Sequence, residues 1–397
     1  MKPAEYGSRA YRKITLAISI GGFSNFALLY GAQPLMPNFS HEFGLPAAGA
    51  SGVISMATGA MALSLIPASV LADRLGKRAL MLFSVFASAF ITLLCCAVDD
   101  FSQLLVLRAL LGISLACLPA VAIAYLSEEI DSRHVGRAIG LYIAGNALGS
   151  MGGRFLAAIV ADASSWRLAM AVLGGITLVA AGAFAQGLPS GAERPARRCR
   201  ICELMAAARS HFADAGLPWL FVTGFILMGC FVSVFNYLAY RLGTAPFGFS
   251  QSKSSLIYAL NAAGIFASAW AGALADRLGR RNVLWILVAC MLAGLLLTLP
   301  DSVLCIYAGT ALLSFGFFGG HSVASSWLGF RALQHKALAT ALYLSIYYLG
   351  SSLLGAASGL MWSAQHWDGV VLLLGTLLSA CLLIALRLRG LVPRSPV

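Results

Sequence analysis

The stretch Ser69-Val-Leu-Ala-Asp-Arg-Leu-Gly-Lys-Arg78 returns late in the chain as Gly272-Ala-Leu-Ala-Asp-Arg-Leu-Gly-Arg-Arg281. Seven of the ten positions are identical, and the two aspartates are 203 residues apart (276 minus 73). Each copy stands between two long apolar segments, where a hydrophobic chain needs a tight polar hairpin. Two matches at equivalent places in two halves of one chain indicate an internal duplication.

The composition is that of a membrane protein that crosses the bilayer many times. Charged residues make up 11% of the chain and hydrophobic residues 59%, against about 25% and 45–50% in soluble proteins. Most of the nine cysteines lie inside apolar segments and are expected to be packing residues. Cys199 and Cys202 form a lone CxxC pair with no nearby histidine, so we expect no metal site.

Apolar segments long enough to cross a bilayer number twelve, and we expect an all-α fold of twelve transmembrane helices. The predicted spans are 14–36, 48–71, 79–98, 102–127, 135–161, 166–187, 217–243, 252–275, 282–299, 303–328, 338–363 and 368–388. They predict an N-terminal six-helix bundle at 1–187, a cytoplasmic linker loop at 188–216 and a C-terminal six-helix bundle at 217–397.

The basic residues indicate the orientation of the chain. With a cytoplasmic N-terminus, 22 of the 27 lysines and arginines fall on the inside. The linker loop contributes five of them, Arg194, Arg197, Arg198, Arg200 and Arg209. This positive-inside pattern predicts a multi-pass membrane protein with both termini cytoplasmic. It also accounts for the net charge of +12 without nucleic-acid binding.

The repeated stretch resembles the loop between the second and third helices of the major facilitator superfamily. The residues that carry the resemblance are Asp73, Arg74, Gly76, Lys77 and Arg78, repeated as Asp276, Arg277, Gly279, Arg280 and Arg281. The resemblance implies two six-helix bundles related by a pseudo-twofold axis around a central cavity. In the family the loop acts as a conformational latch during alternating access, and Glu128 and Glu129 are candidate partners for Arg78. The alternative is a polar loop that only sets the topology.

The fifth segment resembles the glycine-rich helix of facilitator-family antiporters. Gly145, Gly149 and Gly153 lie one turn apart and predict close approach of a neighbouring backbone. The proline that ends the family motif is missing, and Arg154 stands in that region.

Two arginines lie inside predicted spans. Arg108 begins an Arg-x-x-x-Gly pattern that resembles the family's fourth-helix motif, which is often linked to proton coupling, and Arg154 lies at a similar depth. None of the fifteen acidic residues lies well inside a span. Backbone carbonyls, tyrosine or water could satisfy both guanidinium groups, or the two could form a pocket for an anionic substrate.

His321 is the only one of six histidines well inside a span. Histidine titrates near neutral pH, so His321 could carry a proton during transport, or it could be a packing residue among glycines. Uncharged polar and aromatic residues complete a candidate substrate and proton pathway: Asn25, Tyr30, Gln33, Asn146, Asn236, Tyr240, Asn261 and Tyr347.

These features predict a secondary transporter that exports a small organic solute in exchange for protons by alternating access. The first- and eleventh-segment sequences Tyr30-Gly-Ala-Gln-Pro and Tyr348-Leu-Gly-Ser-Ser352 resemble the bacterial drug and sugar efflux branch, and the resemblance implies a location in the bacterial inner membrane. A proton-coupled importer of an organic anion, a passive facilitator and a non-transporting receptor are the alternatives. No enzyme motif is present. We expect no cofactor beyond the proton gradient, and a monomer whose partners are a small-molecule substrate and the lipid bilayer.

Overall fold

The computed structural model describes residues 4–131, 133–189 and 201–390, and nearly all of them are helical. The first half consists of α1 (Arg9–Tyr30), α2 (Met36–Glu42), α3 (Ala47–Ala50), α4 (Gly52–Leu75), α5 (Lys77–Leu94), α6 (Phe101–Ala116), α7 (Ala122–Glu129), α8 (Val135–Ala163) and α9 (Trp166–Gly187). The second half consists of α10 (Ile201–Phe212), α11 (Leu217–Gly243), α12 (Gln251–Ser255), α13 (Ala262–Leu278), α14 (Arg280–Leu297), α15 (Val303–Arg331) and α16 (Lys336–Arg389).

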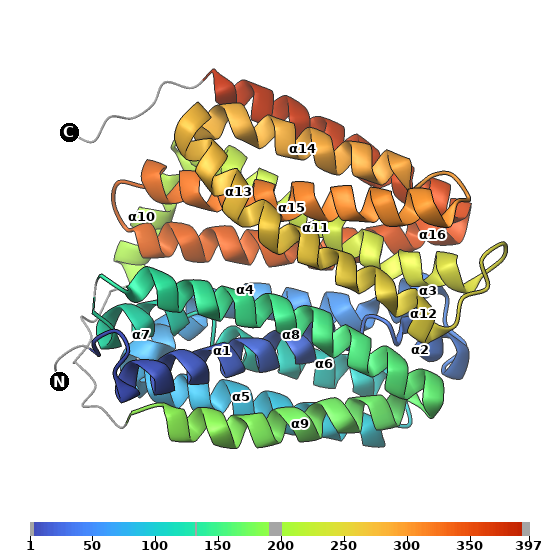
Figure 1. Ribbon diagram of the computed structural model, residues 1–397, viewed down its shortest axis with the longest axis horizontal. Coiled ribbons are helices and arrows are strands. Elements are labelled where there is room, and N and C mark those ends of the chain that lie inside the picture. The colour runs from blue at the N-terminus through green and yellow to red at the C-terminus, as the bar shows by residue number, and fades with distance from the viewer. Residues whose placement is uncertain (1–3, 132, 190–200, 391–397) are drawn as a thin grey trace. The chain divides into compact units, whose positions relative to one another are not determined.

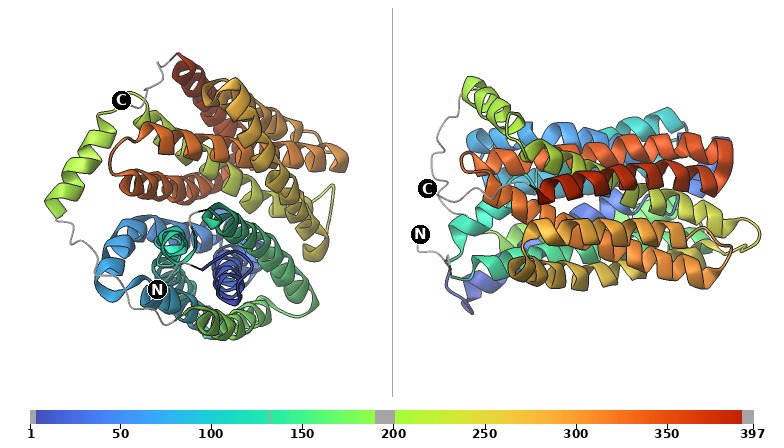
Figure 2. Two further views of the ribbon diagram at one scale, coloured as in Figure 1. Left: turned by 60° about the vertical axis from the view of Figure 1, so that its left-hand side comes forward. Right: turned by 90° about the horizontal axis from the view of Figure 1, so that it is seen from above.

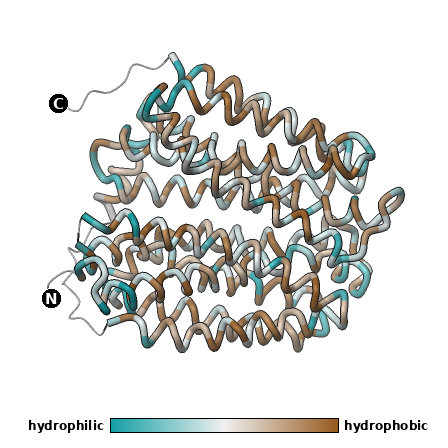
Figure 3. Tube along the Cα trace, in the orientation of Figure 1, coloured by the Kyte–Doolittle hydropathy of each residue, from teal (hydrophilic) through white to brown (hydrophobic). Residues whose placement is uncertain are grey.

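Ten helical segments of the described chain are long and apolar enough to cross a membrane. The 54-residue α16 contains two spans, because the backbone leaves helical geometry at Gln365 and His366. The fourth predicted span is divided into α6 and α7. Pro119 lies between them, and it cannot donate the backbone hydrogen bond that a continuous helix requires. With two spans counted in α16 and one in α6 with α7, the segments agree with the twelve predicted spans. Figure 3 shows hydrophilic residues gathered near the helix ends.

The first predicted span is shorter than expected. It was predicted to run to residue 36, but α1 ends at Tyr30. Pro34 and Pro37 follow closely, and a proline disfavours helical geometry in the residue before it. The four carbonyls at the end of α1 therefore need partners outside the helix.

The chain forms two compact units. Unit 1 comprises residues 1–38 and 56–198, and unit 2 comprises residues 39–55 and 199–397. The segment 39–55, which follows the first span, thus packs with the second half of the chain. Part of the predicted linker, residues 190–200 with four of its five arginines and Cys199, lies outside the described residues.

In unit 1, α1 packs against α8 and α9, and α5 packs against α9 (Figure 1). The predicted close approach along the fifth span is confirmed. A side chain at Gly145 would collide with the backbone of Ser19, and one at Gly149 with the backbone of Phe23. Glycine at these positions brings α1 and α8 into backbone contact, as small residues do between membrane helices.

In unit 2, α11 is the central helix and packs mainly on α16 and α15. Segment 39–55 adds α3, which packs on α16, where a side chain at Gly359 would collide with Ala48. Two hydrogen bonds hold this segment. Ser352 Oγ donates to the carbonyl of Ser55 at 2.7 Å, and the Ser40 and Tyr240 hydroxyls are 2.7 Å apart. Figure 2 shows α10 leaving the body of unit 2 at the end where α11 begins.

Candidate functional site

The two repeated loops share one backbone conformation. Gly76 has φ 88° and ψ 143°, and Gly279 has φ 86° and ψ 138°. Only glycine adopts this region without strain. Each glycine joins two consecutive helices, α4 to α5 and α13 to α14. The duplication seen in the sequence is therefore also present in the local structure.

In the first loop, the residue that reaches the fourth span is Lys77. Its Nζ lies 2.5 Å from Oε1 of Glu128 at the end of α7. The sequence had suggested Arg78 as the partner of both glutamates, and for Glu128 the structure shows Lys77 instead. Glu129 ends α7, and its backbone carbonyl accepts a hydrogen bond from the amide of Ala4 at 2.7 Å.

The second loop makes the equivalent contact with different chemistry. Arg280 donates to Asp276 one turn earlier at 3.1 Å and to the Ser326 hydroxyl on α15 at 3.0 Å. Its guanidinium lies 3.9 Å from the centre of the Phe330 ring. The remaining loop candidates, Asp73, Arg74 and Arg277, are exposed at the ends of α4 and α13.

Arg108 is fully buried, and its guanidinium binds backbone carbonyls at the C-terminal end of α1. Of the last four carbonyls of that helix, Ala27 accepts from Gly31 N and Tyr30 accepts from Gln33 N. The other two, of Leu28 and Leu29, accept from the two terminal nitrogens of Arg108 at 3.1 and 2.7 Å. A cation at a helix C-terminus is also favoured by the helix dipole. Of the two roles considered for Arg108, the structure supports that of a helix cap.

Arg154 is also fully buried but lies in a different environment. Its Nε donates to the Gln33 side-chain oxygen at 2.5 Å, and Nη1 donates to the carbonyl and hydroxyl of Ser150. The guanidinium lies 4.4 Å from the centre of the Tyr30 ring. Three predicted site residues, Tyr30, Gln33 and Arg154, therefore meet where the end of α1 approaches α8. We call these three residues, with Ser150, the Arg154 cluster.

Two predicted asparagines also lie at the contact between α1 and its neighbours. Asn146 faces α1, since a side chain at Gly22 would collide with its amide oxygen. Asn25 is buried, and its amide makes no hydrogen bond within the described part of the chain. The Tyr30 hydroxyl is likewise buried without a hydrogen bond among the described residues. Asn146, Ser150 and Arg154 are spaced four residues apart, which places them along one face of α8.

His321 lies in an aromatic cluster of unit 2. Its Nδ1 is 3.0 Å from the hydroxyl of Tyr343 on α16. The imidazole centre is 4.6 Å from that of Tyr347 and 6.3 Å from that of Phe317. The Tyr343 ring centre is 5.6 Å from the imidazole centre, so three aromatic rings of the described chain surround His321. One of them, Tyr347, belongs to the predicted set.

The other predicted residues of unit 2 contact different elements. Asn236 on α11 lies near Gly355 of α16, Tyr240 bonds Ser40, and Asn261 accepts from Ser314 of α15 at 3.1 Å. They do not form one cluster with His321. No group of three or more histidine, cysteine or acidic side chains suited to a metal occurs among the residues described.

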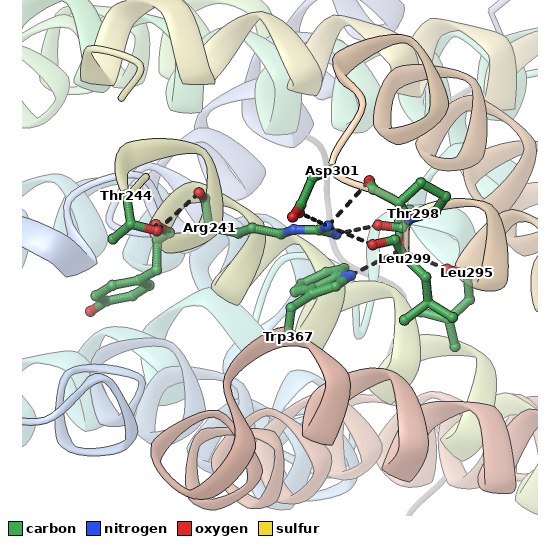
Figure 4. Close-up of polar contacts among 9 residues, drawn as sticks. Arg241, Thr244, Leu295, Thr298, Leu299, Asp301 and Trp367 are labelled. Atoms are coloured by element: carbon green, nitrogen blue, oxygen red, sulfur yellow. Dashed lines mark hydrogen bonds and ion pairs between the residues drawn. The ribbon is translucent and has the colours of Figure 1, made fainter. Parts of the chain in front are cut away.

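Two further arginines, Arg241 and Arg331, make buried contacts that the sequence does not predict. Arg241, at the end of α11, donates to the carbonyls of Thr298, Leu299 and Pro300 and to the carboxylate of Asp301 (Figure 4). It thus binds the turn that follows α14, which ends at Leu297. The Pro-Asp pair after an apolar segment marks a helix end in the sequence, but the distant arginine that binds this turn carries no local signal.

Arg331 forms the second of these contacts, a buried ion pair with Asp214. Its Nε and Nη2 donate to the two carboxylate oxygens at 2.5 and 3.3 Å. Burial by itself raises the pKa of Asp214. Hydrogen bonds from Arg331 and from the backbone of Gly216 and Leu217, together with the charge of Arg331, outweigh burial and lower that pKa. The pair joins the start of α11 to the end of α15.

Known proteins resemble this chain over most of its length. The family model of the Major Facilitator Superfamily matches residues 18–328. The Bacillus subtilis MFS-type transporter YybF is 40% identical over 389 residues, which cover 98% of this chain and 95% of that protein. The Escherichia coli inner membrane transport protein YnfM is 40% identical over 382 residues, covering 96% and 92%.

Solved structures agree with this result. The crystal structure of a bacterial homologue of the human lysosomal transporter Spinster, in an inward-facing and unoccupied conformation, superposes with a TM-score of 0.73. The identity is 16%, and the match covers 97% of this chain and 96% of that one. The all-helical membrane fold predicted from the sequence is therefore confirmed.

Proposed function

The chain belongs to the major facilitator superfamily, and from that premise we propose that it is a proton-coupled exporter of a small organic solute in the bacterial inner membrane. Transport would follow an alternating-access cycle, in which the substrate site opens in turn to each side of the membrane. The inner-membrane location is supported by the 40% identity to YnfM. No cofactor is required, because the proton gradient would supply the driving force.

The observation that carries proton coupling is the environment of His321. No acidic side chain lies well inside a predicted span, and His321 is the only histidine that does; histidine is the residue type whose ordinary pKa lies near neutral pH. The Tyr343 hydroxyl at 3.0 Å offers the imidazole one hydrogen bond, and that bond depends on the protonation state of the ring. Protonation would change this contact at the junction of α15 and α16, which gives the proton a route to a conformational change.

A second candidate, a proton-coupled importer of an organic anion, is favoured by the Arg154 cluster. Arginine stays protonated in proteins. The buried guanidinium of Arg154 contacts the Gln33 side chain, Ser150 and the Tyr30 ring. A carboxylate substrate would complement this positive charge, as charges inside membrane proteins usually face a partner or a cavity.

Transport by the purified protein in vesicles separates these possibilities. A thermal-shift panel of organic anions, cationic amphiphiles, sugars and neutral amino acids first identifies a ligand. A ligand at about 100 times its dissociation constant adds roughly 2.7 kcal/mol to the free energy of unfolding. Uptake of that ligand is then measured with the vesicle interior either acid or alkaline relative to the medium.

The direction of the response decides between the two candidates. Faster uptake into acid-interior vesicles supports antiport and therefore export. Faster uptake from an acid medium supports symport and therefore import. Uptake that is equal in both gradients contradicts proton coupling altogether. Loss of anion binding in Arg154→Gln, with cation binding unchanged, supports the anion candidate.

A further inference from the structure

Helix α10 presents an apolar face that its own unit does not cover. Met205 and Phe212 are 68% and 51% exposed, whereas Ala207 and His211 are buried. At about 100° per residue, positions 205 and 212 lie within about 20° of each other around the helix. The helix therefore has one side against unit 2, at Ala207 and His211, and a partly exposed apolar side formed by Met205 and Phe212.

A positive charge borders this apolar face. Arg209 follows Met205 by one turn, so it lies beside the apolar face, and it is exposed. Exposed Ala206 and Ser210 occupy the neighbouring, more polar part of the surface. A helix with large apolar side chains flanked by arginine is typical of helices that lie in the plane of a membrane surface.

The surroundings of α10 place it where unit 2 enters the membrane. The Phe212 ring is 5.5 Å from that of Phe221 in the membrane-spanning helix α11. Trp219, in the first turn of α11, has the Arg387 guanidinium 4.8 Å from its ring centre. Tryptophan and arginine at the ends of membrane helices mark the boundary between lipid and water. Figure 2 shows α10 leading into α11 at this end of the unit.

We propose that Met205, Arg209 and Phe212 form a docking face for an anionic phospholipid surface. Met205 and Phe212 would enter the boundary between headgroups and acyl chains, and Arg209 would contact a lipid phosphate. Lipid is the occupant that fits this position, because α11 already crosses the bilayer and several arginines gather at this end of the unit. Arg387 and Arg389, which end α16, add to the positive charge. The docked helix would hold the start of α11 at the membrane surface.

Site-specific photo-crosslinking of the full chain in lipid nanodiscs tests this face. The photoreactive residue p-benzoyl-phenylalanine replaces Met205, Phe212 or, as the matched control, Ala206, which is also exposed but lies about 100° away from Met205. Phospholipid adducts detected by mass spectrometry are expected at positions 205 and 212, with few at 206. Equal adducts at 206, or crosslinks to protein alone, would overturn the proposal.

Lipid charge provides the second readout. Nanodiscs of phosphatidylcholine alone are compared with nanodiscs that also contain phosphatidylglycerol. One arginine near an anionic surface contributes about 1 kcal/mol, so the adduct yield at Met205 is expected to rise about fivefold with the anionic lipid. Arg209→Gln should remove that rise. An adduct yield that does not change with lipid charge, either with Arg209 or with Arg209→Gln, would contradict the role proposed for Arg209.

Discussion

Lys77 and Arg280 occupy equivalent positions in the duplicated loops, and each reaches the fourth span of its own unit. Lys77 pairs with a carboxylate, Glu128, whereas Arg280 bonds a hydroxyl, Ser326, and covers the ring of Phe330. In both copies of the loop the side chain therefore contacts the fourth span of its own unit, but the residue that it contacts differs. The two contacts should respond differently to salt, because only the first joins two opposite charges.

The coupling between Lys77 and Glu128 should be small and sensitive to salt. Both side chains are partly exposed, at 26% and 44%, and such pairs contribute about 0.2–1 kcal/mol. A double-mutant cycle with Lys77→Met and Glu128→Gln, measured by thermal unfolding, should show this coupling at low salt and lose most of it at high salt. The matched cycle on Arg280 and Ser326 should change little, and equal salt dependence in the two cycles would contradict the assignment.

Replacing the hairpin glycines should destabilise both loops alike. Gly76→Ala and Gly279→Ala place a side chain at φ 88° and 86°, with a strain of about 1–3 kcal/mol each. The matched controls are Gly136→Ala and Gly140→Ala in α8, where a side chain meets open space. These controls should be neutral or slightly stabilising, because alanine favours helix more than glycine does. Similar melting temperatures for all four variants would argue against the shared hairpin geometry.

Replacing Arg108 and Arg154 by glutamine should have different effects, the first mainly on stability and the second mainly on ligand binding. Arg108→Gln leaves the carbonyls of Leu28 and Leu29 short of two donors, at a cost of about 1–3 kcal/mol for each buried group left unpaired. Arg154→Gln keeps a donor near Gln33 and should affect ligand binding more than folding. Unfolding midpoints and ligand thermal shifts measured on both variants test the distinction. A destabilised Arg154→Gln beside a stable Arg108→Gln would reverse the two roles.

The Asp214–Arg331 pair should make stability depend on pH in acid. The pKa of Asp214 is lowered in the folded protein, so its contribution is present above the unfolded value of about 3.9 and is lost as pH falls through the folded value. Asp214→Asn should therefore be less stable than the parent at pH 7, by about 3 kcal/mol, since it leaves a buried arginine without its carboxylate.

The difference between Asp214→Asn and the parent should shrink as the pH falls below about 4. Thermal unfolding of both proteins across this range measures it. Asp99→Asn serves as the control for an exposed aspartate, and its replacement should change the unfolding temperature little at pH 7. A constant gap between Asp214→Asn and the parent would show that the ion pair does not titrate as assigned.

Much of the fold could be predicted because local patterns determine it. The lengths of the apolar segments define the spans, and the repeated hairpin marks the duplication. The fifth-segment glycines also have a local signature, and their contacts with Ser19 and Phe23 follow from it. The break at Pro119 and the early end of α1 before Pro34 depend on prolines inside apolar runs, which hydropathy alone does not register.

The partners of the charged residues could not be predicted from the sequence. Arg108 is separated in sequence by 80 and 79 residues from Leu28 and Leu29, whose carbonyls it caps. Arg241 and Asp214 likewise find their partners on distant helices. Which arginine caps a helix and which lies near a tyrosine depends on helix packing, and composition and spacing do not report it. The Arg154 cluster was predicted as separate candidates, and only the fold brings Tyr30 and Gln33 to the same guanidinium.

The most direct test of proton coupling is transport by His321→Gln. Glutamine can replace the hydrogen bond to Tyr343 but does not titrate. In vesicles with the identified ligand, the parent should show uptake that a pH gradient accelerates, while His321→Gln should keep ligand counterflow at equal pH and lose the acceleration. If His321→Gln is still accelerated by the gradient as much as the parent, His321 is not the proton carrier and the account of coupling is wrong.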